Sequence, residues 1–304
     1  MWKKKNNYEV YNYNIYSVAP KRNNWIIYII IMSIIILICL TIITMYCIKS
    51  IKINISYKKY EKQLAQIQNE QKDEEIAKIG QTLLPQLTDV GRQNIEQIYN
   101  SETKQVFLTF DDGPSVNTSL ILDILKQENI KATFFMLGTC VESKPELVKR
   151  VYEEGHYIAN HGYSHVYSSI YASPETVLDE YNRCNTAVQN AIGVIEYNSH
   201  LFRFPGGLNG GKYEQIKVQA KQLLNENNIV NVDWNSLTGD SESQEPTQDM
   251  LMQRLIETTS GKNSIVLLMH DSHSKGITVE TLPQVITYLK KQGYEFKNFY
   301  EIIK

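Results

Sequence analysis

Residues 106–114 read VFLTFDDGP, an apolar stretch that ends in two adjacent aspartates and a Gly-Pro turn. The β-branched and aromatic residues of the apolar part favour a buried β-strand. Successive side chains of a strand point to opposite faces, so Asp111 and Asp112 need a local twist to share one site. We expect Gly113 to supply the unusual backbone angles. Taken alone, the segment is more typical of a turn or a helix cap, so its interpretation depends on the rest of the chain.

The pattern of short apolar segments continues to the C-terminus. Further short apolar runs lie at residues 132–137, 156–160, 201–204, 229–234, 265–270 and 294–299, with amphipathic helical patterns between them. Strand–helix alternation of this kind predicts a parallel sheet or an α/β barrel. With about seven strands, we expect a distorted (β/α) barrel whose active site lies at the carboxyl ends of the strands.

Three other expected strands also end in polar side chains. The third leads into HGYSH, where His161 and His165 are four residues apart, a spacing that brings both rings to one metal ion if the segment forms a helical turn. The fourth ends in RFPGG, and Arg203 at such a tip can neutralise and orient carboxylates. The sixth ends in LMHD, which makes His270 a candidate general acid or base.

The joint pattern is more informative than any one motif. The residues concerned come from four separate strand ends and are Asp111, Asp112, His161, His165, Arg203 and His270. One aspartate with two histidines suits a zinc-like ion that keeps open positions for water and substrate. The remaining carboxylate, imidazole and guanidinium are then available for proton transfer and tuning. The sequence therefore predicts metal-assisted hydrolysis.

These motifs resemble those of the polysaccharide deacetylases of carbohydrate esterase family four, also called nodulation-protein-B-like deacetylases. The resemblance covers about residues 104–304, with TFDDG as the first motif. HGYSH matches the second, with Gly162 in place of Ser or Thr. RFPG matches the third, with Gly206 in place of an aromatic residue, and LMH matches the last. Four motifs in order form a specific signal.

The resemblance implies a role for each matched residue. The ligands of one divalent metal ion, usually zinc and sometimes cobalt or another ion, would be Asp112, His161 and His165. Asp111 would be the general base that activates a water molecule, and His270 the general acid that protonates the leaving amine. Arg203 would keep Asp111 ionised and oriented.

Substrate contacts are expected from the loop after the fourth strand and from the motif that follows it. The backbone N–H of Gly206 can still stabilise an oxyanion, because that role needs no side chain. We also expect Gly207 and Trp234 to contact the substrate.

One motif of the family, D-x-x-D-W, departs from its usual form, because residues 230–241 read VNVDWNSLTGDS. In a direct match, Asp233 and Trp234 align and Val230 replaces the first aspartate. The segment also resembles a D-W-N…G-D variant, in which Asp240 is the carboxylate that partners the catalytic histidine. We favour Asp240. In that match, Ser241 stands where the family has an aromatic residue that lines the substrate groove. We therefore expect the groove to be more open.

The N-terminal part has a different composition. Residues 25–48 read WIIYIIIMSIIILICLTIITMYCI and carry no charge. A transmembrane helix needs about 20 apolar residues, whereas a cleaved signal peptide usually has about 7–15. A buried core helix would usually show a polar stripe. We therefore expect a short cytoplasmic tail at 1–24, a transmembrane helix at 25–48, a polar helical spacer at 49–103 and the deacetylase domain at 104–304.

Basic residues do not decide the orientation of this span, because five lie near each side. A domain that acts on a wall polymer belongs outside the cell. We therefore expect a single-pass protein of the cell membrane with an extracellular catalytic domain, anchored by residues 25–48.

The expected partner is an N-acetylated polysaccharide of the cell wall or the cell exterior. Peptidoglycan N-acetylglucosamine is the first choice, and poly-N-acetylglucosamine, chitin oligomers and acetylated xylan are alternatives. A catalytically dead glycan-binding protein is a second class of function. The net charge of -2 argues against nucleic-acid binding, which needs a basic surface. The oligomeric state and any pairing of Cys140 with Cys184 stay open.

Overall fold

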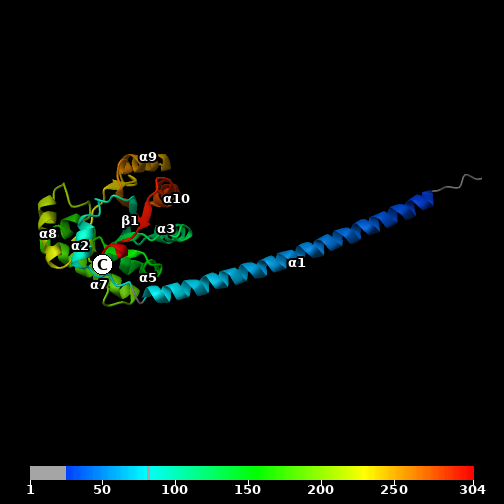
Figure 1. Cartoon of the computed structure of the whole chain (residues 1–304), viewed down its shortest axis with the longest axis horizontal. Helices are drawn as coiled ribbons and strands as arrows, with labels where there is room; N and C mark the ends of the chain where they lie inside the picture. Colours follow the sequence, from blue (N-terminus) through cyan, green and yellow to red (C-terminus); the bar gives the residue numbers. More distant parts are fainter. Residues whose placement is uncertain (1–24, 81–82) are drawn as a thin grey trace, which may run out of the picture. The chain divides into compact units, whose positions relative to one another are not determined.

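The computed structural model describes residues 25–80 and 83–304 (Figure 1). The expected cytoplasmic tail, 1–24, lies outside the described residues. The chain divides into two units between Gln71 and Lys72, and each is described by itself.

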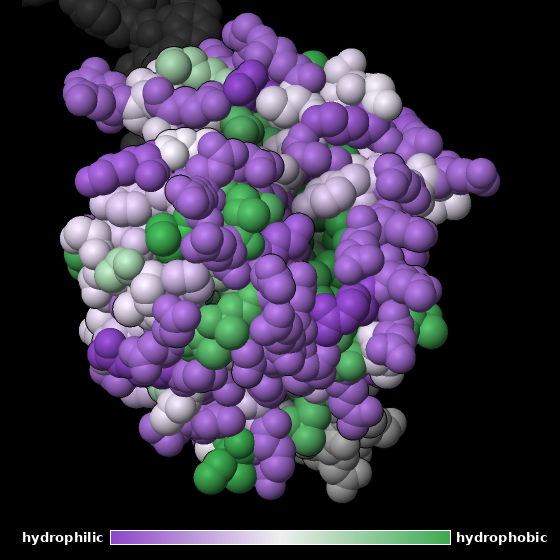
Figure 2. Space-filling view, turned by 90° about the vertical axis from the view of Figure 1, so that its left-hand side faces the viewer, coloured by the Kyte–Doolittle hydropathy of each residue, from purple (hydrophilic) through white to green (hydrophobic). Residues whose placement is uncertain are grey.

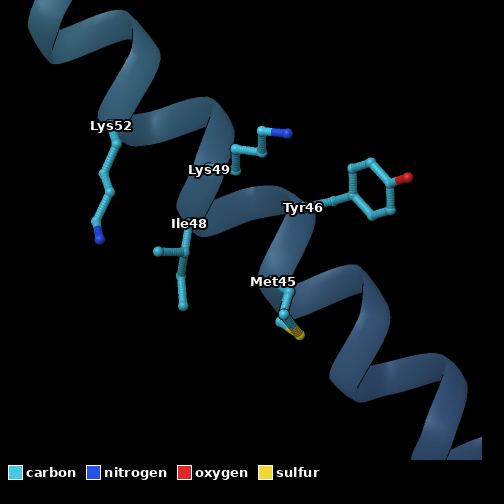
Figure 3. Close-up of a pocket in the computed structure, with 5 residues that line it drawn as sticks. All are labelled: Met45, Tyr46, Ile48, Lys49 and Lys52. Atoms are coloured by element: carbon cyan, nitrogen blue, oxygen red, sulfur yellow. The ribbon is translucent and has the colours of Figure 1, made fainter.

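Helix α1, Trp25–Gly80, contains the apolar run found in the sequence (Figure 1). Within the described residues, one stretch is long and apolar enough to cross a membrane, Trp25–Lys52, and none of its most apolar window is buried. Exposed apolar side chains fit a lipid environment and not a protein core. The run gives way to Tyr46, Lys49 and Lys52, whose side chains leave the helix in different directions (Figure 3). Tyrosine and lysine at such a place suit a membrane–water interface.

The second unit is built on one parallel sheet. Its strands are β1 Gln105–Gly113, β2 Thr133–Met136, β3 Tyr157–Asn160, β4 Leu201–Phe202, β5 Val230–Asn231, β6 Ser236–Leu237, β7 Ser264–His270 and β8 Glu295–Lys297. Seven of them follow the order β5-β4-β3-β2-β1-β7-β6, and β8 pairs with the start of β1. Each apolar run of the sequence contains one strand. The short β6 was not expected, since two residues carry no periodic pattern.

The sheet must curl, because its two edge strands are close neighbours in the sequence. Only residues 232–235 connect β5 to β6, which stand at opposite ends of the strand order. A flat sheet would separate these edges by about 29 Å, at about 4.8 Å per strand. The connection spans at most about 19 Å, at about 3.8 Å per residue. The expected distorted (β/α) barrel is confirmed.

Helices surround this sheet (Figure 1). They are α3 Val116–Gln127, α4 Gly138–Ser143, α5 Pro145–Glu153, α6 Tyr167–Ile170, α7 Pro174–Ile192, α8 Glu214–Glu226, α9 Gln248–Thr259 and α10 Gly276–Lys291, with a final 3-10 turn at Phe299–Glu301. Side chains of β1 alternate between two cores, as a strand requires. Leu108 and Phe110 pack with apolar residues of α3, α5 and α10, whereas Phe107 packs with Phe135 and Phe299 on the other face.

The compact domain begins before residue 104, where the sequence analysis placed its boundary. Helix α2, Asp89–Glu96, follows an N-cap at Thr88, whose hydroxyl accepts the N–H of Gly91 at 2.9 Å. Ile95 and Ile98 are buried in the same core as Phe107. The expected spacer, 49–103, therefore contributes its C-terminal part to the domain. Within that domain Cys140 and Cys184 are free thiols.

Candidate active site

The aspartates at the end of β1 reach one site because the strand bulges between them. The register of β1 against β2 shifts between Asp111 and Gly113, and Asp112 has a φ of 72°. The expected twist is present, but the expectation that Gly113 supplies it is wrong, since the left-handed residue is Asp112. Gly113 instead allows the side chain of Asp271 to come close to the backbone, because a Cβ at position 113 would lie 2.5 Å from Oδ2 of Asp271.

His161 and His165 converge through a loop. His161 follows β3, and α6 begins only at Tyr167. Within residues 161–165, Gly162 has a φ of 87° and His165 has a φ of 57°. A helical turn does not contain such angles. The expected helical turn is therefore wrong, but the two imidazole centroids still lie only 5.4 Å apart.

A buried carboxylate that the sequence analysis missed anchors this loop. Oε2 of Glu180, on α7, accepts the N–H groups of Tyr163 at 2.7 Å and Ser164 at 2.6 Å, and Oε1 accepts the Ser164 hydroxyl at 2.8 Å. The signal for it was present, because Glu180 lies in the apolar stripe of α7 between Val177 and Cys184. A charge at such a position is costly unless it is paired.

The three expected metal ligands lie together. Asp112, His161 and His165 each offer one ligand atom within 4.8 Å of the others. Oδ1 of Asp112 lies 3.6 Å from Nε2 of His161 and 3.4 Å from Nε2 of His165. That oxygen is buried without a hydrogen-bond partner in the described part of the chain, and a cation would satisfy it.

The orientation of His161 also fits a metal ligand. Its Nδ1 lies 2.7 Å from the carbonyl oxygen of Arg203, so Nδ1 carries the proton and donates it. The lone pair of Nε2 then faces Asp112. Burial lowers the pKa of His161 to about 3, and the ring is therefore neutral, as a ligand must be. This donor set fits a divalent metal ion.

Arg203 is fully buried and bonds both to Asp111 and to the segment that connects β5 to β6. Its Nη1 donates to Oδ1 of Asp111 at 2.7 Å and to the Thr109 hydroxyl at 2.8 Å. Its Nε donates to the carbonyl of Val232 at 3.0 Å, and its guanidinium carbon lies 3.9 Å above the Phe135 ring. Burial raises the pKa of Asp111, and the charge of Arg203 opposes that rise.

His270 ends β7 and is held by Asp240. Its Nδ1 lies 2.8 Å from Oδ1 of Asp240, and its backbone N–H donates to Oδ2 at 2.7 Å. The Thr278 hydroxyl donates to the same carboxylate at 2.8 Å. Burial opposes protonation of His270, but the hydrogen bond and charge of Asp240 outweigh burial and raise the pKa of the imidazole.

Asp233, the other candidate of the ambiguous motif, has a different environment. Its Oδ2 accepts the N–H of Leu208 at 3.0 Å, and its side chain lines a separate pocket. The register that brings a carboxylate to His270 is therefore the one with Asp240. Ser241, which follows it, lies 3.1 Å from Nδ1 of His270 through its hydroxyl.

The expected substrate-contacting residues lie on one loop and its neighbour. Gly206 and Gly207 both have a φ of 76°. The N–H of Gly207 donates to the carbonyl of Phe204 at 2.7 Å, whereas the N–H of Gly206 has no acceptor among the described residues. A side chain at position 207 would begin 3.1 Å from the ring of Trp234.

Tyr167 is a further residue that the sequence analysis missed. A Cβ on Gly206 would lie 2.7 Å from the Tyr167 hydroxyl, so this phenol fills the space beside the missing side chain. Its ring packs edge-on against His165 at 5.5 Å between centroids. The residue is 39% exposed and therefore accessible to a ligand. No motif marked it, because its place depends on the loop conformation.

Fold and site together define a class of protein: a metal-dependent hydrolase on a distorted parallel barrel. A carboxylate and two imidazoles form a group that could hold a metal ion. A second carboxylate, Asp111, and a third imidazole, His270, lie at neighbouring strand ends.

Comparison with known proteins gives the family. A family model described as polysaccharide deacetylase matches residues 99–225. A peptidoglycan-N-acetylglucosamine deacetylase of Bacillus cereus is 34% identical over 205 residues, which cover 66% of this chain and 71% of that protein.

Solved structures agree. A CE4 esterase of Streptococcus mutans has a TM-score of 0.62 at 32% identity, covering 68% of this chain and 90% of that one. The catalytic domain of a peptidoglycan N-acetylglucosamine deacetylase from Eubacterium rectale has a TM-score of 0.60 at 30% identity, covering 66% and 90%. The chain belongs to the polysaccharide deacetylase family, and the resemblance found in its motifs is confirmed.

Proposed function

We propose that this protein removes acetyl groups from N-acetylated sugar residues of a cell-wall polymer, with peptidoglycan N-acetylglucosamine as the substrate. The observation that carries the proposal is the pairing of Asp111 with His270 on adjacent strands, beside the ligand set of Asp112 and two histidines. Amide hydrolysis needs a base for the attacking water and an acid for the leaving nitrogen, and this arrangement supplies both.

Asp111 acts as the base in this proposal. One of its carboxylate oxygens is held by Arg203, so the other is free to accept a proton from water. Burial raises the pKa of Asp111, which brings a carboxylate closer to the range where a base works best. The resulting hydroxide attacks the acetyl carbonyl carbon.

His270 acts as the acid. Its Nδ1 is engaged by Asp240, so Nε2 carries the proton that is given to the departing nitrogen. The C–N bond breaks as that proton is transferred. The products are acetate and a free amino group on the sugar.

The developing negative charge on the acetyl oxygen needs donors. The unengaged N–H of Gly206 is one in this proposal. A divalent ion held by Asp112, His161 and His165, which we propose to be zinc, would polarise the carbonyl and make water more acidic.

The relatives support the choice of polymer, because two of the matched proteins are named as peptidoglycan-N-acetylglucosamine deacetylases. An apolar helix long enough to span a membrane is consistent with action at the wall. We therefore propose a single-pass membrane protein with its N-terminus inside the cell and its catalytic domain outside.

The deciding experiment measures acetate release by the purified full chain from peptidoglycan, chitin oligomers, poly-N-acetylglucosamine and acetylated xylan. We expect peptidoglycan to be preferred, and Asp111→Asn to abolish release. Preference for another polymer would overturn the substrate. Absence of release from all four, with metal bound, would favour a glycan-binding protein without activity.

A further inference from the structure

The proposed oxyanion donor, the N–H of Gly206, belongs to a tight turn made by residues 204–207. Pro205 and Gly206 are its two central residues, and the N–H of Gly207 donates to the carbonyl of Phe204 at 2.7 Å. Gly206 has a φ of 76°. A proline followed by a glycine with positive φ is the pattern of a type II turn. Gly206 is exposed, whereas Pro205 and Gly207 are buried, so the turn presents Gly206 at the surface of the domain.

The direction of the Gly206 N–H depends on the peptide unit that joins this residue to Pro205. A trans peptide is planar, and its N–H and C=O point in opposite directions. Type I and type II turns differ by a turnover of this central peptide, and proline at the second position is compatible with both. Glycine at the third position can adopt a φ of either sign. The local sequence therefore does not decide which way the N–H points.

A buried phenol holds this peptide from the inside of the domain. Tyr171 directly follows α6 and is only 2% exposed, and its hydroxyl donates to the carbonyl of Pro205 at 2.7 Å. Burial raises the pKa of Tyr171, so the phenol keeps its proton and can donate it. Because the carbonyl is bound on the buried side, the N–H of Gly206 points the other way. A hydrogen bond to the carbonyl also polarises the peptide and strengthens its N–H as a donor.

The ring of Tyr171 is held in place by contacts that do not involve its hydroxyl. The face of the domain that carries α8 is mostly hydrophilic (Figure 2), but Lys217 of this helix is only 4% exposed. Its ammonium donates to the carbonyl of Gly207 at 2.6 Å and lies 5.4 Å from the centroid of the Tyr171 ring. The ring of Tyr213 packs on the same phenol at 5.3 Å between centroids. Removing the hydroxyl of Tyr171 therefore leaves the packing of its ring intact.

We propose that Tyr171 is a positioning residue for the reaction: its hydroxyl holds the peptide between Pro205 and Gly206 with the N–H toward the substrate. This inference rests on the proposed function, in which that N–H stabilises the negative charge on the acetyl oxygen. Without the hydrogen bond, the peptide can turn over. Its carbonyl oxygen then faces the substrate and repels the developing charge in place of stabilising it.

Kinetics separate this role from a purely structural one. In the full chain, Tyr171→Phe should lower kcat for an N-acetylated glycan about tenfold, the effect of one lost hydrogen bond. KM and metal content should stay unchanged, because the oxyanion forms only in the transition state. Tyr294→Phe is the matched control, since its buried hydroxyl donates to the backbone carbonyl of Lys262 just before β8, and it should keep full kcat. An unchanged kcat in Tyr171→Phe, or an equal loss in both variants, would overturn the proposal.

The state of this peptide can also be measured without catalysis. Pro205-Gly206 is the only Pro-Gly pair in the sequence, so ¹³C-carbonyl proline combined with ¹⁵N-glycine gives a single HNCO cross-peak. Tyr171→Phe should shift this peak, because the Pro205 carbonyl loses its hydrogen bond, and Tyr294→Phe should leave it in place. An unmoved peak in Tyr171→Phe would overturn the inference. A shifted peak in a chain that releases acetate from no glycan would instead overturn the proposed function and leave the hold of Tyr171 on the turn standing.

Discussion

Asp111 and His270 are direct register partners on the parallel strands β1 and β7. Each is held from behind by a residue of opposite charge, Asp111 by Arg203 at 2.7 Å and His270 by Asp240 at 2.8 Å. Arg203 favours the ionised carboxylate and Asp240 favours the protonated imidazole. In the proposed mechanism, the two partners thus prepare a base and an acid at neighbouring strand ends, which is the state that amide hydrolysis needs at its start.

The first prediction concerns the metal site. Asp112→Ala or His161→Ala should reduce bound metal at least about a hundredfold and abolish acetate release, because each removes one of three ligand atoms that lie within 4.8 Å of one another. Elemental analysis of the purified variants measures the metal. His273→Ala changes an exposed histidine and should bind metal normally. Full metal content in either ligand variant would contradict the assignment.

The second prediction concerns pH. The pKa of His270 is raised by Asp240, so the protonated acid persists to higher pH, and activity falls as the pH rises through that pKa. Asp240→Asn removes the charge and should move the alkaline limb of the pH–rate profile to lower pH while the metal content stays intact. Asp233→Asn should leave the limb in place, because Asp233 bonds to Leu208 and not to His270. The reverse pattern would restore the direct reading of the motif.

Much of this site was predictable from residues at strand ends. The parallel fold places those ends on one face, so Asp111, His161, Arg203 and His270 could be brought together from the sequence alone. The backbone conformation within each short motif could not be predicted from the sequence. For example, we expected the unusual backbone angles of the first motif at Gly113, but the residue with a φ of 72° is Asp112.

The partners of residues that act through distant contacts were also beyond the sequence, even where, as for Glu180, the burial of the residue was not. Glu180 is separated from Ser164 by 16 positions and reaches it only after α7 has packed. Tyr167 fills the space beside Gly206 and follows an HGYSH segment that is a loop and not a helix. Periodicity reports which face of an element is buried, but it does not report which loop that face supports.

The third prediction follows from Glu180. Glu180→Gln turns one of the two acceptor oxygens into an NH₂ group and removes the negative charge that the donors of Tyr163 and Ser164 share, so their hydrogen bonds should weaken and the loop carrying His165 should loosen. We expect about tenfold weaker metal affinity, the effect of losing support for a metal ligand. Asp179→Asn, at the exposed neighbouring position, is the control. Unchanged affinity in Glu180→Gln would show that the loop holds its shape without this anchor.

The fourth prediction concerns topology. If residues 25–48 cross the cell membrane with the N-terminus inside, protease added to intact, wall-stripped cells should digest the catalytic domain. A cytoplasmic marker protein in the same sample must survive, which shows that the cells are intact. Survival of the domain until the cells are lysed would refute the orientation.

The last prediction concerns Tyr167. Its hydroxyl lies beside the space that a side chain at Gly206 would occupy, and its ring packs against His165, so it borders both Gly206 and the candidate ion site. A phenol at that place can donate a hydrogen bond to the acetamido group of the substrate. Tyr167→Phe should therefore lower kcat/KM about tenfold, with unchanged metal content, because the ring and its packing on His165 remain. Tyr163→Phe, on the same loop with its hydroxyl bonded to Glu142 at 2.8 Å, is the matched control and should retain full activity. Equal kcat/KM values for Tyr167→Phe and the unmodified protein would show that the phenol only fills space.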